Sequence, residues 1–311
     1  MASLLSTLIG CFQKKEKVND LPAWLETHFP GELVVVNNIV NLDPMNLFIK
    51  EKNTILADKN DPEVQIKIKW FKKEEGLGLN VEEVRTSLDN ARKDVKAARM
   101  IFDALQKNGL EKFSVGAIEM AAYILIYDEP TSELRKSNLI KILTAIDGLP
   151  DHTQTSIWIE WMEPSAYQEE FKDIIPYGYW QRGDSYHDSK KIMGLDFEWS
   201  PGLKADILNA GWAISIKSER SLTYQDGAYQ AASVWADKNL RAPFYLEKDQ
   251  MITIGPDEDD RMGIEFQFPY FTTKPDTSVS GFEDSALGHV RVVYQTDQKT
   301  FGKFKKIKND E

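Results

Sequence analysis

A short polar loop holds the residue types that a hydrolase needs. His187 follows Ser185 closely and is flanked by Asp184 and Asp188. Neighbouring carboxylates raise the pKa of a histidine and hold one tautomer, which suits a general base. Members of a catalytic triad normally converge from separate elements, because neighbours in one loop seldom reach each other in the required geometry. We therefore interpret this loop as an ordinary polar loop.

Two further acids stand where an active-site carboxylate could lie. Asp128 and Glu129 come directly after the apolar run 120–127 and directly before Pro130. Acids just beyond the carboxyl end of a strand can bind a metal or act as a base. The same residues before a helix are also ordinary turn and capping residues, which is the interpretation that we favour. Together with His187 they define an alternative function, that of a hydrolase with or without a metal.

Standard catalytic and cofactor motifs are mostly absent. The chain has no P-loop, no complete dinucleotide fingerprint, no G-x-S-x-G elbow and no H-E-x-x-H pair. The acidic run 257–260 fails the calcium-loop pattern, because Arg261 and Met262 occupy the positions that need a ligand and a glycine. The sequence therefore predicts no cofactor and no metal site, and it leaves enzymatic activity open.

A more informative signal is aromatic. Residues 164–191 show no clear periodicity but are rich in Tyr and Trp. A long irregular segment in a folded chain is usually functional or disordered, and aromatic richness argues against disorder. Trp, Tyr and Arg anchor protein interfaces, and aromatic rings also stack on sugars. The predicted binding residues are Tyr177, Tyr179, Trp180, Arg182, Tyr186 and His187. The competing interpretation is that the rings fill a seam between two halves, with Trp158 or Trp161 in the core.

One long helix organises the first half of the chain. Apolar residues recur at alternating steps of four and three between Asn80 and Gly109, which predicts a buried stripe along a helix over 80–108. Asn80 is placed as the N-cap with Glu83 three residues on, and Gly109 tolerates the left-handed conformation that ends a helix. The charged opposite side is interpreted as a solvated face rather than as a basic patch. A sheet is the expected cover.

Shorter elements surround this helix in an irregular order. Strict alternation of apolar and polar residues, as in 64–70, predicts strands with one wet face, whereas the run 120–127 predicts a strand covered on both sides. The other expected strands are 33–36, 47–49, 157–161, 193–199, 212–216, 244–246, 251–254, 262–268 and 290–294, and the other expected helices are 21–29, 131–148, 200–211 and 228–240.

The resulting fold class is α+β, with mixed or antiparallel sheets covered by the helix 80–108 and by several shorter helices. The predicted domains are an N-terminal amphipathic segment (1–20), an N-terminal α+β domain (21–163), an aromatic-rich connecting segment (164–191) and a C-terminal α+β domain with a basic tail (192–311). Two similar strand-helix-strand runs raise the alternative of a duplication.

Composition limits the function classes. The 311 residues are 42% hydrophobic and 11% aromatic, as in a folded globular chain. The formal net charge of -11 argues against nucleic-acid binding, which needs a surplus of Lys and Arg. The single cysteine, Cys11, excludes an internal disulfide. No stretch reaches the ~20 apolar residues that a membrane span requires.

The first 17 residues allow three interpretations. Leu4, Leu8 and Phe12 share one side of a short amphipathic helix, which we expect to dock on its own domain. The alternatives are weak peripheral membrane contact and a lipoprotein acylated at Cys11, although no basic residue precedes the apolar run. The sequence therefore predicts a cytoplasmic bacterial protein. Its most favoured function is non-enzymatic recognition of a protein partner, as an adaptor, inhibitor or immunity-type factor, and its acidic surface suits a basic partner.

Overall fold

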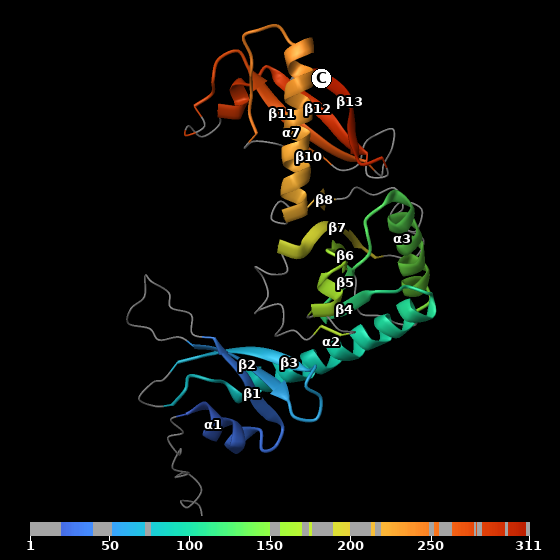
Figure 1. Ribbon diagram of the computed structural model, residues 1–311. Helices are drawn as coiled ribbons and strands as arrows, with labels where there is room; N and C mark the ends of the chain where they lie inside the picture. The colour runs from blue at the N-terminus through green and yellow to red at the C-terminus, as the bar shows by residue number, and fades with distance from the viewer. Residues whose placement is uncertain are drawn as a thin grey trace, which may run out of the picture. The chain divides into compact units, whose positions relative to one another are not determined.

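The chain divides into two compact units, Met1–Arg92 and Lys93–Glu311 (Figure 1). The predicted division at 164–191 falls inside the second unit, and the predicted domains stay a prediction. The computed structural model describes residues 20–39, 52–71, 76–149, 156–169, 174–175, 189–199, 213–214, 219–248, 252–254, 263–276, 278, 282–295 and 298–308.

The first unit is built on a three-stranded antiparallel sheet in the order β1-β2-β3. Its elements are helix α1 (Leu21–His28) and strands β1 (Leu33–Ile39), β2 (Lys52–Asp58) and β3 (Gln65–Trp70). Asp20 caps α1 by accepting a hydrogen bond from the amide of Ala23 at 2.9 Å. Strand β2 was not expected, and the expected strand 47–49 lies outside the described residues.

Helix α2 (Val81–Lys107) begins and ends at the expected signals. The side chain of Asn80 accepts a hydrogen bond from the amide of Glu82 at 2.9 Å, while its own amide group donates to the carboxylate of Glu83 at 3.2 Å. The carboxylate of Glu83 is therefore engaged by the cap side chain rather than by the cap backbone. Gly109 follows the helix with φ +75°, a left-handed conformation that favours glycine. The predicted stripe is buried except at Phe102, which is half-buried and stacks on Phe113.

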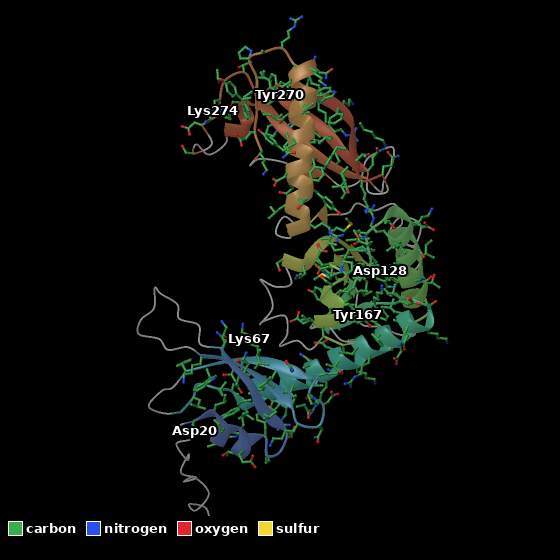
Figure 2. The ribbon with its side chains drawn as sticks, viewed as in Figure 1. Asp20, Lys67, Asp128, Tyr167, Tyr270 and Lys274 are labelled. Carbon is green, nitrogen blue, oxygen red and sulfur yellow. The ribbon has the colours of Figure 1, made fainter. Side chains whose placement is uncertain are left out.

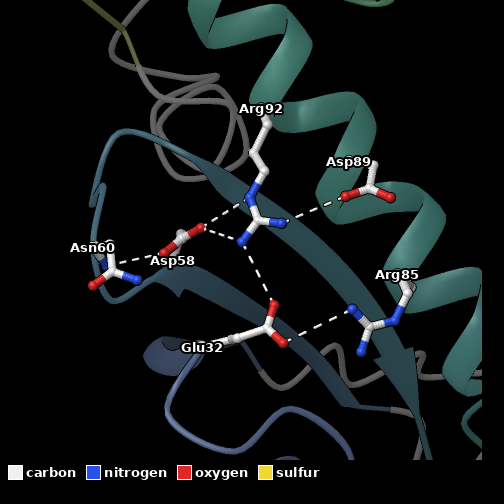
Figure 3. A network of polar contacts seen from close by, with 6 residues as sticks. All are labelled: Glu32, Asp58, Asn60, Arg85, Asp89 and Arg92. Carbon is white, nitrogen blue, oxygen red and sulfur yellow. Dashed lines mark hydrogen bonds and ion pairs between the residues drawn. The ribbon is translucent and has the colours of Figure 1, made fainter.

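A polar network holds the end of β2 to the part of α2 that belongs to the first unit (Figure 3). Arg92 donates from Nε and Nη2 to the Oδ2 atom of Asp58, at 3.0 and 2.6 Å. Arg92 also lies 3.6 Å from the carboxylate of Glu32 and 3.5 Å from that of Asp89, and Arg85 forms a longer pair with Glu32. Because the side chain of Asp58 is only 5% exposed, the guanidinium of Arg92 is needed to compensate the buried negative charge.

The second unit contains a five-stranded mixed sheet in the order β4-β5-β6-β7-β8. Its strands are β4 (Phe113–Ile118), β5 (Ala121–Ile126), β6 (Ser156–Met162), β7 (Lys191–Glu198) and β8 (Ala213–Ile214). The pair β5–β6 is parallel and is connected through helix α3 (Ser132–Asp147), and the other pairs are antiparallel. Strand β4 was not expected, because Ser114 and Gly116 interrupt its apolar pattern.

One face of this sheet belongs to the main hydrophobic core. Ile124 and Ile159 from the sheet cluster there with Ile101 of α2 and with Leu139 and Ile142 of α3. Figure 1 shows α3 running along this side of β4, β5 and β6. The opposite face of the sheet carries a short helix, α4 (Ala166–Glu169), at one end.

A second, antiparallel sheet follows in the order β10-β11-β12-β13, with β9 also paired to β11. Its elements are β9 (Tyr245–Leu246), β10 (Ile252–Ile254), β11 (Ile264–Phe271), the 3-10 turn η1 (Phe282–Ser285), β12 (Gly288–Gln295) and β13 (Thr300–Lys308). Helix α7 (Glu219–Asn239) packs across β12 (Figure 1). Residues 299–308 were expected to be a basic tail, and residues 300–308 instead form β13, which pairs with β12 across one register shift.

Helix α7 begins nine residues before its expected start at Ala228. The pair Asp226-Gly227 just before the expected start is typical of a turn. The helix instead continues through Gly227, where a Cβ atom would lie 2.7 Å from the ring of Phe301, so this close packing requires a glycine. The fold class is α+β, as predicted. Among the described residues, no helix combines the length and the apolar character needed to cross a membrane.

Candidate functional site: an aromatic and acidic sheet face

Three residues form a row across the face of the β4–β8 sheet that points away from the main core. In the register of the sheet, Tyr123 of β5 lies opposite Trp158 of β6, and Trp158 lies opposite Asp196 of β7. Directly opposite residues in a sheet have Cβ atoms about 4.5–5.5 Å apart, so their side chains interact. We refer to these three residues as the 123–158–196 row.

The two rings of the row pack on each other and remain partly open to solvent. Tyr123 and Trp158 stack with centroids 5.9 Å apart and an interplanar angle of 23°. Trp158 is 37% exposed, and its indole N–H donates to the hydroxyl of Ser156 at 3.0 Å. Because this N–H is engaged within β6, the ring face is what Trp158 offers to a ligand.

The surroundings of the row are acidic. Asp196 and Glu198 are exposed on β7, and Glu119 is exposed in the turn before β5. Glu160 is buried beside the row and pairs with Lys191 at 2.5 Å. Burial raises the pKa of Tyr123, and the charges of Glu160 and Glu119 raise it further. The hydroxyl of Tyr123 therefore sits in a negative field.

The described part of the aromatic segment 164–191 packs on this same face. Ala166, Tyr167 and Ile175 pack with Leu125 and Met162, whose side chains alternate onto the face of the 123–158–196 row. Beyond them, Ile174 forms a parallel bridge with Val115 of the edge strand β4. The described part of the segment therefore covers one end of the face, and the row lies at the other end.

The six predicted binding residues, Tyr177, Tyr179, Trp180, Arg182, Tyr186 and His187, lie outside the described residues. Their role as a binding site stays a prediction. The question whether Trp158 or Trp161 is in the core is answered, because Trp161 is fully buried and Trp158 is exposed. Alternation along β6 puts large rings on both faces, and the packing of α2 and α3 on one face buries Trp161.

No family model and no curated protein matches this chain. Among solved structures, the chain is similar to the crystal structure of a DUF5037 family protein from Ruminococcus gnavus ATCC 29149, at 11% sequence identity and a TM-score of 0.29. That similarity covers 61% of this chain and 85% of the other chain. At this level it carries no argument about fold or function.

Asp128 and Glu129 lie in separate ion pairs. Asp128 accepts a hydrogen bond from Asn138 at 3.3 Å and lies 3.8 Å from the ammonium of Lys112 (Figure 2 labels Asp128). Both carboxylate oxygens of Glu129 accept hydrogen bonds from Arg220, at 2.7 and 3.3 Å. Within the described residues, no group of three or more His, Cys, Asp or Glu side chains could hold a metal. Convergence of these acids with His187 is not tested, because His187 lies outside the described residues.

Arg220 joins the start of α7 to the five-stranded sheet. It pairs with Glu163, after the end of β6, at 2.9 Å, in addition to Glu129. One turn later on α7, Tyr224 stacks on Tyr294 of β12 with centroids 4.6 Å apart. Burial raises the pKa of Tyr224 to about 12, and the nearby Tyr294 adds to the rise.

This pKa predicts that the protein loses stability in alkali. In the unfolded chain Tyr224 ionises near its ordinary pKa of 10, while the folded protein keeps the proton up to about 12. Between these values the unfolded state binds fewer protons, so stability falls as the pH rises. We expect the melting temperature of Tyr224→Phe to fall less between pH 10 and pH 12 than that of the wild type. Tyr245→Phe, at an exposed position on β9, serves as the control and should fall as the wild type does.

A shallow hollow of about 180 Å³ lies at the start of α2 in the first unit. Lys67 and Lys69 of β3 line it together with Asn80 and Glu83. The side chain of Asn80 already satisfies an amide at the start of the helix, and Glu83 adds negative charge. The hollow is therefore poorly suited to an anion, and the 123–158–196 row is the better candidate site.

Proposed function

We propose that this protein recognises another protein through the aromatic face of the β4–β8 sheet, acting as an adaptor, an inhibitor or an immunity-type factor. The observation that supports this is the stacked pair Tyr123 and Trp158, which stays partly exposed on the face where the described part of segment 164–191 packs. The proposed interface includes the predicted residues of this segment, with Trp180 as an anchor.

Physical chemistry favours an interface at this position. Trp and Tyr are enriched among the residues that carry most of the binding energy, because each buries a large area and loses few rotamers. A sheet holds its side chains rigidly, so Trp158 needs little ordering when a partner covers it. The net charge of -11 suits a basic partner through electrostatic steering.

The location in the bacterial cytoplasm is part of the same proposal. It is supported by the single cysteine, which cannot form an internal disulfide of the kind that secreted proteins often carry. Residues 1–19, including Cys11, lie outside the described residues, so the membrane-surface and lipoprotein alternatives stay predictions.

The test is a pull-down from the lysate of the native host with four baits. These are the wild type, Trp158→Ala, Trp180→Ala and the control Tyr245→Ala, which removes an aromatic ring that is 43% exposed on the other sheet. We expect a stoichiometric partner that binds the wild type and the control and is lost, by at least about tenfold in yield, with both tryptophan variants.

The melting temperatures of the variants show whether a variant fails to bind because its interface is altered or because it is unfolded. Truncating one exposed cross-strand aromatic residue costs about 0.2–1 kcal/mol, so Trp158→Ala should remain folded. A partner that binds all four baits equally would contradict the proposed interface, and so would the absence of any partner. In the latter case the hydrolase alternative with Asp128, Glu129 and His187 would become the next one to test.

A further inference from the structure

The 123–158–196 row places a carboxylate beside an exposed aromatic ring. Asp196 is exposed and lies directly across from Trp158 in the register of β6 and β7. Among the described residues, no ion pair or hydrogen bond engages the side chain of Asp196. A group lying on the ring of Trp158 is therefore within reach of this carboxylate.

The cations near the start of β7 are already engaged. Lys191 lies over Gly194, where a Cβ atom would be 3.2 Å from the lysine Cε, and reaches Glu160 at 2.5 Å. Gly194 lies opposite Glu160 in the sheet, so the missing side chain is what allows this pairing. The ammonium of Lys190 interacts with Glu163, beyond the end of β6. Neither lysine neutralises Asp196.

Among the described residues, two further exposed charges near the row are negative. Glu198 follows Asp196 on the same face of β7, and Glu119 lies close enough to raise the pKa of Tyr123. An aromatic ring attracts a cation over its face, and nearby carboxylates add to this attraction. The chemistry of the row is therefore that of a receptor for a positive charge.

A guanidinium fits this arrangement better than an ammonium. It is planar, so it stacks on an indole, and it presents donors in a fork that a carboxylate can accept. We propose that the 123–158–196 row binds the guanidinium of an arginine side chain supplied by the protein partner, stacked on Trp158 and hydrogen-bonded to Asp196. This inference rests on the proposed function, because it specifies the partner at the same face.

The test uses the full chain with 15N-labelled tryptophan and follows the eight indole N–H signals by NMR. Trp158→Phe identifies the signal of Trp158. The probes are N-acetyl-arginine amide, the isosteric but uncharged N-acetyl-citrulline amide, and the neutral sugar methyl glucoside. We expect the arginine compound to shift the Trp158 signal in a saturable way, with roughly two- to fivefold weaker binding in Asp196→Asn.

Asp237→Asn, which removes an exposed carboxylate from α7, is the matched control and should bind the arginine compound as the wild type does. The proposal is overturned if the Trp158 signal does not move, if the citrulline compound or the sugar moves it equally, or if Asp196→Asn has no effect. If the pull-down captures a partner through Trp158 but the NMR experiment gives any of these results, the proposed function is retained and only the proposal of a bound arginine is rejected.

Discussion

Gly288→Ala is expected to lower the free energy of unfolding by about 3 kcal/mol. Gly288 begins β12 with φ +148°, a conformation that residues with a side chain rarely adopt. A Cβ atom built there would lie 2.2 Å from the carbonyl oxygen of Ile307 in β13. The atom in the way is backbone, so it cannot move aside without breaking the pairing of Gly288 with Lys308. Both the backbone strain and the lost strand pairing therefore act in the same direction.

Gly302→Ala is the matched control, because it changes the partner strand of the same pair. A Cβ atom at Gly302 would lie 3.5 Å from a side-chain oxygen of Gln295, which is an ordinary contact. We expect its stability to stay within about 1 kcal/mol of the wild type. Urea unfolding followed by tryptophan fluorescence measures both variants. Equal stability of the two would show that β12 does not approach β13 as closely as the structure has it.

Arg92→Met is expected to destabilise the first unit by about 2–3 kcal/mol. The substitution keeps the apolar stem of the side chain and removes the guanidinium that donates twice to Asp58. The hydrogen bond to Asp58 is the main reason why the pKa of Arg92 is raised. After the change, the buried carboxylate of Asp58 keeps the hydrogen bond that it accepts from the backbone amide of Asn60, at 2.9 Å. The effect falls below that of a fully buried pair because the side chain of Arg92 is 40% exposed.

The double variant Asp58→Asn with Arg92→Met shows whether the loss of stability comes from an unpaired buried charge or from lost packing. A neutral amide at position 58 still accepts a hydrogen bond from Asn60 and costs less to bury than a carboxylate does. The double variant should therefore regain at least half of the lost stability. Asp89→Asn removes an exposed and longer contact of Arg92 and should change stability by less than about 0.5 kcal/mol. Hydrogen exchange of the β2 amides reports on this unit alone, and exchange rates unchanged in Arg92→Met would contradict the prediction.

Local patterns predicted the elements whose signals do not depend on the rest of the chain. Helix α2 has a long stretch of apolar residues at helical spacing and a cap at Asn80. Strand β3 has strict alternation of apolar and polar residues, so both elements appear where they were expected. Strand β13 was not predicted, because its many lysines suggested a basic tail. In the structure, Phe301 and Phe304 of this strand pack toward α7. Helix α7 was predicted too short: it begins at Glu219 rather than at Ala228, and Gly227 within it packs against Phe301, a residue 74 positions away.

The candidate site depends on sheet order, which the sequence does not reveal directly. Tyr123 and Trp158 are 35 residues apart, and Asp196 is a further 38 residues along the chain. They become neighbours only because β5, β6 and β7 are adjacent in the sheet. The sequence did indicate an aromatic region, since Trp158 and Trp161 lie just before the segment that was predicted to bind. It could not indicate that the exposed ring would lie beside a carboxylate.

The place of β13 in the second sheet has a consequence for folding during synthesis. The ribosome makes α7 and β10 to β12 before β13, yet Trp235 of α7 stacks on Phe304 and Tyr294 of β12 packs on Phe301. Until β13 emerges from the exit tunnel, these rings and the open edge of β12 have no cover from that strand. Chaperones that hold apolar segments of nascent chains are therefore expected to bind this part of the chain until β13 pairs with β12.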